Sequence, residues 1–242
     1  MTKAPRQIVF SIAPAEGGGF SVLGANRPLK TPRGHALVVP TQALAETIRD
    51  EVAALPGVVA GRGINDPAAA PNFRIAAGAI DVIAADGAAR TQLEKALVGY
   101  GATDLVCYRA PRPDALVARE SREWDPLCAW FEDRFGVRLA QTTGFDAVPC
   151  DARLDEILAA ALAGLDPFRL AAVSLAVHTA GSIVIGLALA EGRLDSEAAF
   201  AASAVGELFQ EQTWGMDKDA AAARAVKRLD LEQAARFLEL LA

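Results

Sequence analysis

The sequence predicts an α+β protein in which a small β-rich N-terminal domain precedes a larger, all-helical C-terminal domain. Two observations carry this prediction. Short runs rich in β-branched and aromatic residues, divided by glycine and proline turns, lie before residue 60. After residue 72 the segments instead repeat apolar residues at helical spacing. We therefore expect one domain over residues 1–60 and a second over residues 61–242.

The N-terminal domain is expected to hold four extended segments and one helix. QIVFSIA and FSVLG are separated by Gly17–Gly19, which suits a hairpin turn. RPLKT and HALVVP continue the extended pattern around a second turn at Pro32–Gly34. Thr41 stands where a helix cap is expected, because apolar residues recur at every fourth position from Leu44. Pro56–Gly57 is expected to end this helix.

The C-terminal domain is expected to consist of helices joined by short turns. Asp166 and Pro167 stand in the order of an N-cap carboxylate and a first-turn proline. The similar pair Asp125–Pro126 falls inside a long helical pattern and predicts a break or restart there. Residues 137–150 alternate in polarity and contain a glycine, so we expect a short extended arm. The expected helices cover residues 73–85, 88–100, 113–136, 152–163, 167–190, 195–213 and 216–241.

Leu170–Ala190 is a run of uncharged residues that is long enough to cross a bilayer. The run contains polar side chains, including His178 and Ser182, and lacks the flanking aromatic and basic belts of a membrane span. A helix that is apolar on every side also suits the centre of a helical domain. We therefore expect a buried central helix near residues 167–190, with His178 hydrogen-bonded in the core. Membrane attachment through this run is the competing hypothesis.

Charge and composition exclude several classes of function. The chain has a net charge of −6 and no basic stripe, so a nucleic-acid partner is not expected. Its three cysteines are widely spaced and it has only two histidines, which argues against a zinc site. Free thiols suit a reducing compartment, and the N-terminal residues lack a signal-peptide pattern. We expect a cytoplasmic protein without a cofactor and without membrane insertion.

The sequence offers few candidates for catalysis. It contains no phosphate-binding loop, nucleophile elbow or HExxH motif. Asp195 and Glu197 are interpreted as a helix cap and a solvated helix face. Glu207 and Glu211 border the apolar face of their helix on a helical wheel. These two carboxylates either pair with an arginine of a neighbouring helix or face a cleft or a partner protein, and the pattern favours neither reading.

The segment ELFQEQTWG, from Glu207 to Gly215, resembles the C-terminal signature of a known chaperone family. These chaperones assemble the catalytic sector of F-type ATP synthase, and the signature is that of the member that handles the α subunit. Further blocks resemble the same family in the same order, over about residues 8 to 230. They are RPLKTP, VVPTQALAETI, NDPAAAP, TDLVCYRA, WDPL, LDPFRLAA and TAGSIVIGLAL.

The resemblance implies a protein that binds and does not catalyse. It would hold the newly made ATP synthase α subunit and shield its subunit-contacting surface until the β subunit replaces the chaperone. We expect the free chaperone to be monomeric, and to be cytoplasmic in bacteria and in the mitochondrial matrix for eukaryotic relatives. The important acidic position of the family maps to Glu207. The implied partner-binding residues are Glu207, Gln210, Glu211, Trp214, Gly215, Asp104, Tyr108 and Arg109.

Each of these assignments has a packing alternative. Trp124 and Trp214 are more often buried anchors than contacts. Tyr108 and Arg109 would then only tie helices together. The family pattern is also not complete, since Met216 stands where an acidic residue is common. The alternative function is an enzyme or small-ligand receptor that uses an interdomain cleft, with Glu207 as acid or base.

Overall fold

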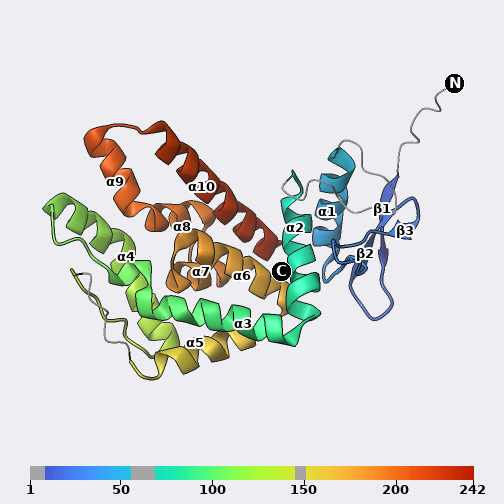
Figure 1. Cartoon of the computed structure of the whole chain (residues 1–242), viewed down its shortest axis with the longest axis horizontal. Helices are drawn as coiled ribbons and strands as arrows, with labels where there is room; N and C mark the ends of the chain where they lie inside the picture. The colour runs from blue at the N-terminus through green and yellow to red at the C-terminus, as the bar shows by residue number, and fades with distance from the viewer. Residues whose placement is uncertain (1–8, 56–68, 145–150) are drawn as a thin grey trace. The chain divides into compact units, whose positions relative to one another are not determined.

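The computed structural model describes residues 9–55, 69–144 and 151–242 (Figure 1). These residues form two compact units, one of Met1–Arg90 with Arg236–Ala242 and the other of Thr91–Ala235. A small antiparallel sheet precedes a helical region, which confirms the predicted fold class. The boundary predicted at residue 60 and the start of the NDPAAAP block lie outside the described residues. Contacts within the first unit extend it past that point, to residue 90.

The sheet is centred on its second strand, which pairs antiparallel with the other three. The first pair runs in register from Phe10 opposite Gly24 to Pro14 opposite Phe20, as a hairpin at the predicted turn requires. Gly19 has φ +77°, and a Cβ there would lie 2.6 Å from the carbonyl oxygen of Val39. Glycine is therefore required where this turn meets the last strand. The strands are β1 (Phe10–Pro14), β2 (Phe20–Gly24), β3 (Arg27–Pro28) and β4 (Val38–Val39).

Helix α1 (Gln42–Ala54) begins at the cap that the sequence predicts. The Thr41 hydroxyl accepts a hydrogen bond from the backbone N–H of Leu44, and the apolar face of the helix packs on β1 and β2. Glu51 then reaches α2 (Pro71–Gly78), where its carboxylate accepts hydrogen bonds from the backbone N–H groups of Asn72 and Phe73. A carboxylate at a helix N-terminus stabilises the unpaired N–H groups there. The π-helix η2 (Ala79–Ala84) continues α2 without a break.

The helices of the second unit pack around the apolar run. In chain order the elements from residue 87 are α3 (Gly87–Val98), η3 (Gly99–Thr103), η4 (Leu105–Cys107), α4 (Asp114–Phe135), α5 (Leu154–Ala163), α6 (Pro167–Ala180), α7 (Ile183–Ala190), α8 (Ser196–Ser203), α9 (Val205–Trp214) and α10 (Lys218–Glu239). Asp166 caps α6 with hydrogen bonds from the N–H groups of Phe168 and Arg169, as predicted.

The prediction of a single central helix over residues 167–190 is wrong in one respect, because the structure has two helices there, α6 and α7. Gly181 ends α6 with φ +69°, and Ser182 starts α7 by accepting a hydrogen bond from the N–H of Ile185. The burial is as expected, since every residue from Ile183 to Leu189 is buried. Gly186 allows α7 to pack close to α6, because a Cβ there would lie 2.4 Å from the side chain of Val177. Within the described residues, no helix is long and apolar enough to cross a membrane.

Three further predictions differ from the structure. Helix α4 continues through Pro126, where we expected a break, because its buried face still packs through Trp124 and Leu127. The helix expected over residues 195–213 is two helices, α8 and α9, divided at Ala204. His178 is exposed and not in the core, because it lies on the outer side of α6. The predicted arm of residues 137–150 lies partly outside the described residues, as does the third cysteine.

Candidate partner-binding site

A cavity of about 610 Å³ lies between α9 and α10, which Figure 1 shows side by side. All the residues that line the cavity, from Glu207 to Lys227, belong to the second unit. One wall is the predicted motif, and it contains all five of the motif residues assigned to partner binding. They are Glu207, Gln210, Glu211, Trp214 and Gly215.

Two ion pairs bridge the cavity from α9 to α10. Glu207 Oε1 lies 2.7 Å from Lys227 Nζ, and Glu211 pairs with Arg224. Both carboxylates keep part of their surface in solvent, with exposed side-chain fractions of 45% for Glu207 and 31% for Glu211. The two readings that the helical wheel left open are therefore both realised. The carboxylates pair with cations of a neighbouring helix and also line a cleft.

The end of α9 presents a large apolar surface beside the cavity. Trp214 is 76% exposed and Met216 is 68% exposed, so the interpretation of Trp214 as a buried anchor is wrong. Gly215, at φ +94°, ends the helix between them. Soluble proteins seldom leave neighbouring large apolar side chains in solvent unless a partner covers them. Tryptophan is also the residue type that most often dominates the energy of protein interfaces.

Asp104 has surroundings of the opposite kind, since it is fully buried. Its carboxylate accepts hydrogen bonds from the Ser182 hydroxyl at 2.6 Å and from the N–H groups of Val184 and Val106, both at 3.1 Å. Burial raises the pKa of this carboxyl to about 6, although these hydrogen bonds act to lower it. Asp104 therefore joins η4 to the start of α7, and burial argues against direct contact with a partner.

Arg109 and Tyr108 belong to the same packed region as Asp104. The Arg109 side chain is only 9% exposed, with Nη1 2.9 Å from Asp125 Oδ1 and its guanidinium 5.1 Å from the centre of the Trp124 ring. Its Nε donates to the carbonyl oxygen of Val106 at 2.8 Å. Trp124 is a buried anchor, as expected, and its Nε1 donates to the carbonyl oxygen of Ala202. Tyr108 is half-buried and pairs with residue 142 in an isolated bridge.

The match to a family model decides which family this fold and these motifs represent. The model of the ATP12 chaperone protein matches residues 9–132. The chain belongs to the ATP12 chaperone family. The resemblance seen in the sequence motifs, to chaperones of ATP synthase assembly, is thereby confirmed.

Solved structures and a curated relative agree with this assignment. The crystal structure of Atp12 from Paracoccus denitrificans is 37% identical, with a TM-score of 0.86 over 96% of this chain and 96% of that chain. A mutant of P. denitrificans Atp12p gives a TM-score of 0.87 at 37% identity, over 96% of this chain and 95% of that chain. Mitochondrial protein atp12 from Schizosaccharomyces pombe is 26% identical over 202 residues, which are 80% of this chain and 68% of that protein.

The remaining chemical candidates in this ATP12 chain are explained by packing. Asp195 caps α8 through the N–H of Ala198, and Glu197 pairs with Arg228 on the surface, as predicted. Burial raises the pKa of the Cys128 thiol, which disfavours the reactive thiolate. Across residues 9–55, 69–144 and 151–242, no three His, Cys, Asp or Glu side chains gather in a group that could hold a metal ion.

Sequence reasoning missed the α10 side of the ATP12 cleft. Arg224 and Lys227 stand three residues apart, and Glu207 and Glu211 stand four apart, so each pair lies on one side of its helix. A short turn between two helices makes them antiparallel neighbours, and these four charges can then pair. The spacing of these four charged residues along the two helices was therefore the sequence signal from which the ion pairs could have been predicted. The exposure of Met216 has no comparable signal in the sequence.

Proposed function

We propose that this chain binds the unassembled α subunit of ATP synthase at the α9–α10 cleft. The exposure of Trp214 and Met216 beside that cavity is the observation that carries the proposal. Family membership supports a role in ATP synthase assembly, and the motif resemblance supports the α subunit as the client. The chaperone would hold the client in the compartment where the ATP synthase assembles, which is the cytoplasm in bacteria.

The cleft suits reversible binding. An unassembled subunit exposes apolar surface that is an aggregation hazard, and Trp214 and Met216 offer apolar area to cover it. Partly exposed ion pairs such as Glu207–Lys227 contribute only about 0–1 kcal/mol, so a client can rearrange them at small cost. A site of this kind binds the α subunit and still releases it when the β subunit competes for the same surface. No catalytic step is needed.

The cavity volume supports a second candidate, a small-ligand receptor, because pockets for small molecules span roughly 300–1,000 Å³. The alternative function considered from the sequence had its small-ligand site in an interdomain cleft. The cavity that Glu207 lines is instead formed by α9, α10 and the turn that joins them. Its rim of exposed Trp214 and Met216 favours a protein client, because aromatic residues and methionine are enriched at protein interfaces.

Binding of purified α subunit by the full chain tests this proposal. We expect a complex at micromolar concentration and less aggregation of the α subunit in the presence of the chaperone. Trp214→Ser with Met216→Ser should weaken binding at least tenfold, because the apolar anchors are removed. Val226→Ser with Leu229→Ser is the matched control, since these residues are 60% and 51% exposed but do not line the cavity. Equal losses in both double variants would contradict the proposed site.

A further inference from the structure

The RPLKTP block is not explained by the α9–α10 cleft. It lies in the first unit, where β3 leads into a hairpin over residues 29–37. Leu29, Thr31 and Leu37 are buried, whereas Lys30 and every residue from 32 to 36 are exposed. The hairpin is therefore anchored by three side chains and presents the rest of its residues to solvent.

The turn of this hairpin has a defined backbone. The N–H of Gly34 donates to the carbonyl oxygen of Thr31 at 2.9 Å, and the N–H of Thr31 donates to that of His35 at 2.9 Å. Pro32 occupies the second position of the turn, where its fixed φ is favoured, and Gly34 has φ +90°. Lys30 and Ala36 form an isolated antiparallel bridge, which places the two arms of the hairpin side by side.

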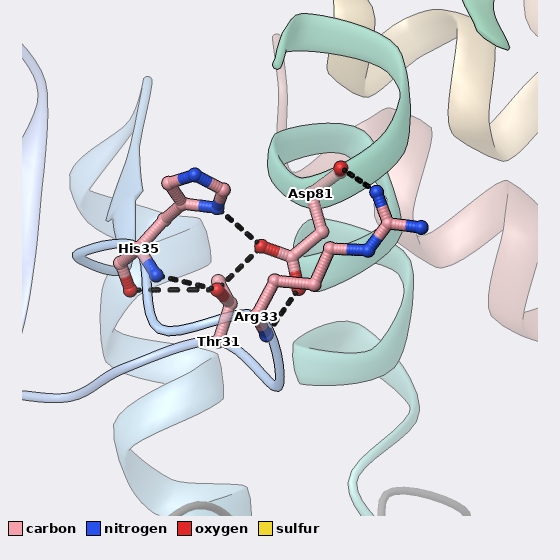
Figure 2. Close-up of polar contacts among 4 residues, drawn as sticks. All are labelled: Thr31, Arg33, His35 and Asp81. Carbon is pink, nitrogen blue, oxygen red and sulfur yellow. Dashed lines mark hydrogen bonds and ion pairs between the residues drawn. The ribbon is translucent and has the colours of Figure 1, made fainter. Parts of the chain in front are cut away.

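A buried carboxylate clamps the turn from η2. Figure 2 shows Asp81 reaching Thr31, Arg33 and His35 at once. The Thr31 hydroxyl donates to Oδ1 at 2.5 Å, and His35 Nδ1 lies 2.7 Å from the same oxygen. The N–H of Arg33 donates to Oδ2 at 3.0 Å, and Arg33 Nη1 donates to the carbonyl oxygen of Asp81 at 2.9 Å.

These hydrogen bonds between Asp81 and the turn, called the clamp below, hold the Arg33 side chain at the surface. Burial acts to raise the pKa of Asp81, but the hydrogen bonds from His35, Thr31 and Arg33 outweigh it and hold the pKa below its usual value. Asp81 is thus a buried charge, which is costly unless it is fully hydrogen-bonded. Here the compensating hydrogen bonds come from the buried Thr31 and from Arg33 and His35 in the exposed part of the turn. The Arg33 guanidinium is therefore held at Nη1, and its other N–H groups have no hydrogen-bond partner among residues 9–55, 69–144 and 151–242.

The exposed charges of the segment around this turn, residues 24–40, share one sign. Residues 24–40 contain three cations, Arg27, Lys30 and Arg33, and no aspartate or glutamate, within a chain of net charge −6. Arg27 and Lys30 are exposed and form no ion pair with any residue that the structure describes. Of the three cations, Arg33 has a side chain held in place by a hydrogen bond to Asp81. A preorganised guanidinium suits a carboxylate of a partner, because little side-chain freedom is lost on binding.

We propose that the clamped turn, residues 30–36, is a second client-contact surface that binds an acidic segment of the client. The proposal rests on the proposed function, since it assigns the same client to both surfaces. Lys30 and Arg33 would donate to carboxylates of that segment, with Arg27 adding to the local field. Three cations are fewer than the four to eight of typical lipid-binding clusters. The turn region also lacks the aromatic side chains on which single-stranded nucleic acid stacks.

Titration of the full chain with purified α subunit at several salt concentrations tests this surface. Lys30→Glu with Arg33→Glu should weaken binding roughly tenfold or more at low salt and flatten the salt dependence. Lys95→Glu with Arg122→Glu makes the same charge change at exposed positions of α3 and α4, and should leave the affinity within about twofold. Thr31→Val keeps all charges but removes the hydroxyl from the clamp, so we expect a smaller loss and faster amide exchange at residue 33.

The outcomes separate the two proposals. If the wild-type chain binds and the Lys30/Arg33 variant binds equally with the same salt dependence, the second surface is wrong and the cleft stands. If the wild-type chain does not bind the α subunit, both proposals fail. Should the charge reversal unfold the chain by circular dichroism, Lys30→Gln with Arg33→Gln is judged by the same criterion. Binding of phosphatidylserine vesicles or single-stranded DNA that depends on Lys30 and Arg33, with α-subunit binding unchanged, would also overturn the proposal.

Discussion

The α9–α10 cleft and the region around Asp104 both contain motif residues of the ATP12 family, but their surroundings are opposite. The cleft exposes Trp214 and part of two paired carboxylates. The other region buries Asp104, and it packs the Arg109 side chain against Trp124. Family motifs therefore include both exposed residues, which we propose contact the client, and buried residues that hold the fold. Burial separates the two kinds, and the two regions should respond differently to substitution.

The two tryptophans should give the largest contrast in stability. Trp124→Ala should lower the free energy of unfolding by about 4 kcal/mol, because it removes a buried ring and its hydrogen bond to Ala202. Trp214→Ala should change it by less than about 0.5 kcal/mol, because that ring is exposed. Urea denaturation measures both. Similar values for the two variants would show that the burial assigned to these rings is incorrect.

The pH dependence of stability should report Asp104. The folded pKa of about 6 exceeds the ordinary value of 3.8, so the folded state holds more protons between these values. Stability should therefore fall by about 3 kcal/mol as the pH rises from about 4 to above 6. Asp104→Asn should lack this component, so the difference between wild type and variant isolates it. A difference that does not change with pH would contradict the buried position of Asp104.

Arg109→Ala should have the next largest effect, a loss of about 2 kcal/mol in the free energy of unfolding. The substitution removes the stacking on Trp124 and leaves the carbonyl oxygen of Val106 without this donor. Arg122→Ala on α4, the helix that carries Trp124, is the control and should stay within about 0.5 kcal/mol, because its side chain is 68% exposed. An equal loss in both variants would mean that Arg109 has no special packing role.

Substitutions at the two cleft ion pairs should have the smallest effects, and Glu211→Gln should lower the free energy of unfolding by about 1 kcal/mol. It removes the charge that pairs with Arg224, whose side chain is only 9% exposed, but leaves a hydrogen-bond acceptor in place. Glu207→Gln, at the more exposed pair with Lys227, should cost less than about 0.5 kcal/mol. Chemical denaturation of the two variants ranks the pairs, and the reverse ranking would place the more buried pair at Glu207.

Much of the fold follows from local sequence signals. The Gly17–Gly19 turn, the Thr41 cap and the Asp166–Pro167 start each depend on residues a few positions apart. The division between α6 and α7 also has a local signal, the helix-ending Gly181 followed by the capping Ser182, which the uncharged run obscured. The hydrogen bond from the Ser182 hydroxyl to Asp104, which lies 78 residues away, is not visible in a local pattern. The continuation of α4 through Pro126 likewise depends on packing, which outweighs the lost backbone hydrogen bond.

The candidate site was predictable to a similar extent. A helical wheel placed Glu207 and Glu211 at the margin of an apolar face of one continuous helix. The structure divides that helix at Ala204, but both carboxylates line the cavity. Their partners Arg224 and Lys227 come from α10, so the pairing depends on how the two helices lie against each other. The exposure of Trp214 depends on the same arrangement, since α9 has only one fully buried residue. A sequence pattern gives the face of a helix but not what covers it.

The affinity of the full chain for purified ATP synthase α subunit, compared between wild type and Glu207→Lys, tests the central claim most directly. The substitution places a second cation beside Lys227 in the cleft. We predict micromolar or tighter binding by wild type and at least tenfold weaker binding by the variant, with an unchanged circular dichroism spectrum. Equal binding by both proteins, or no binding by wild type, would contradict the assignment of the cleft as the client site.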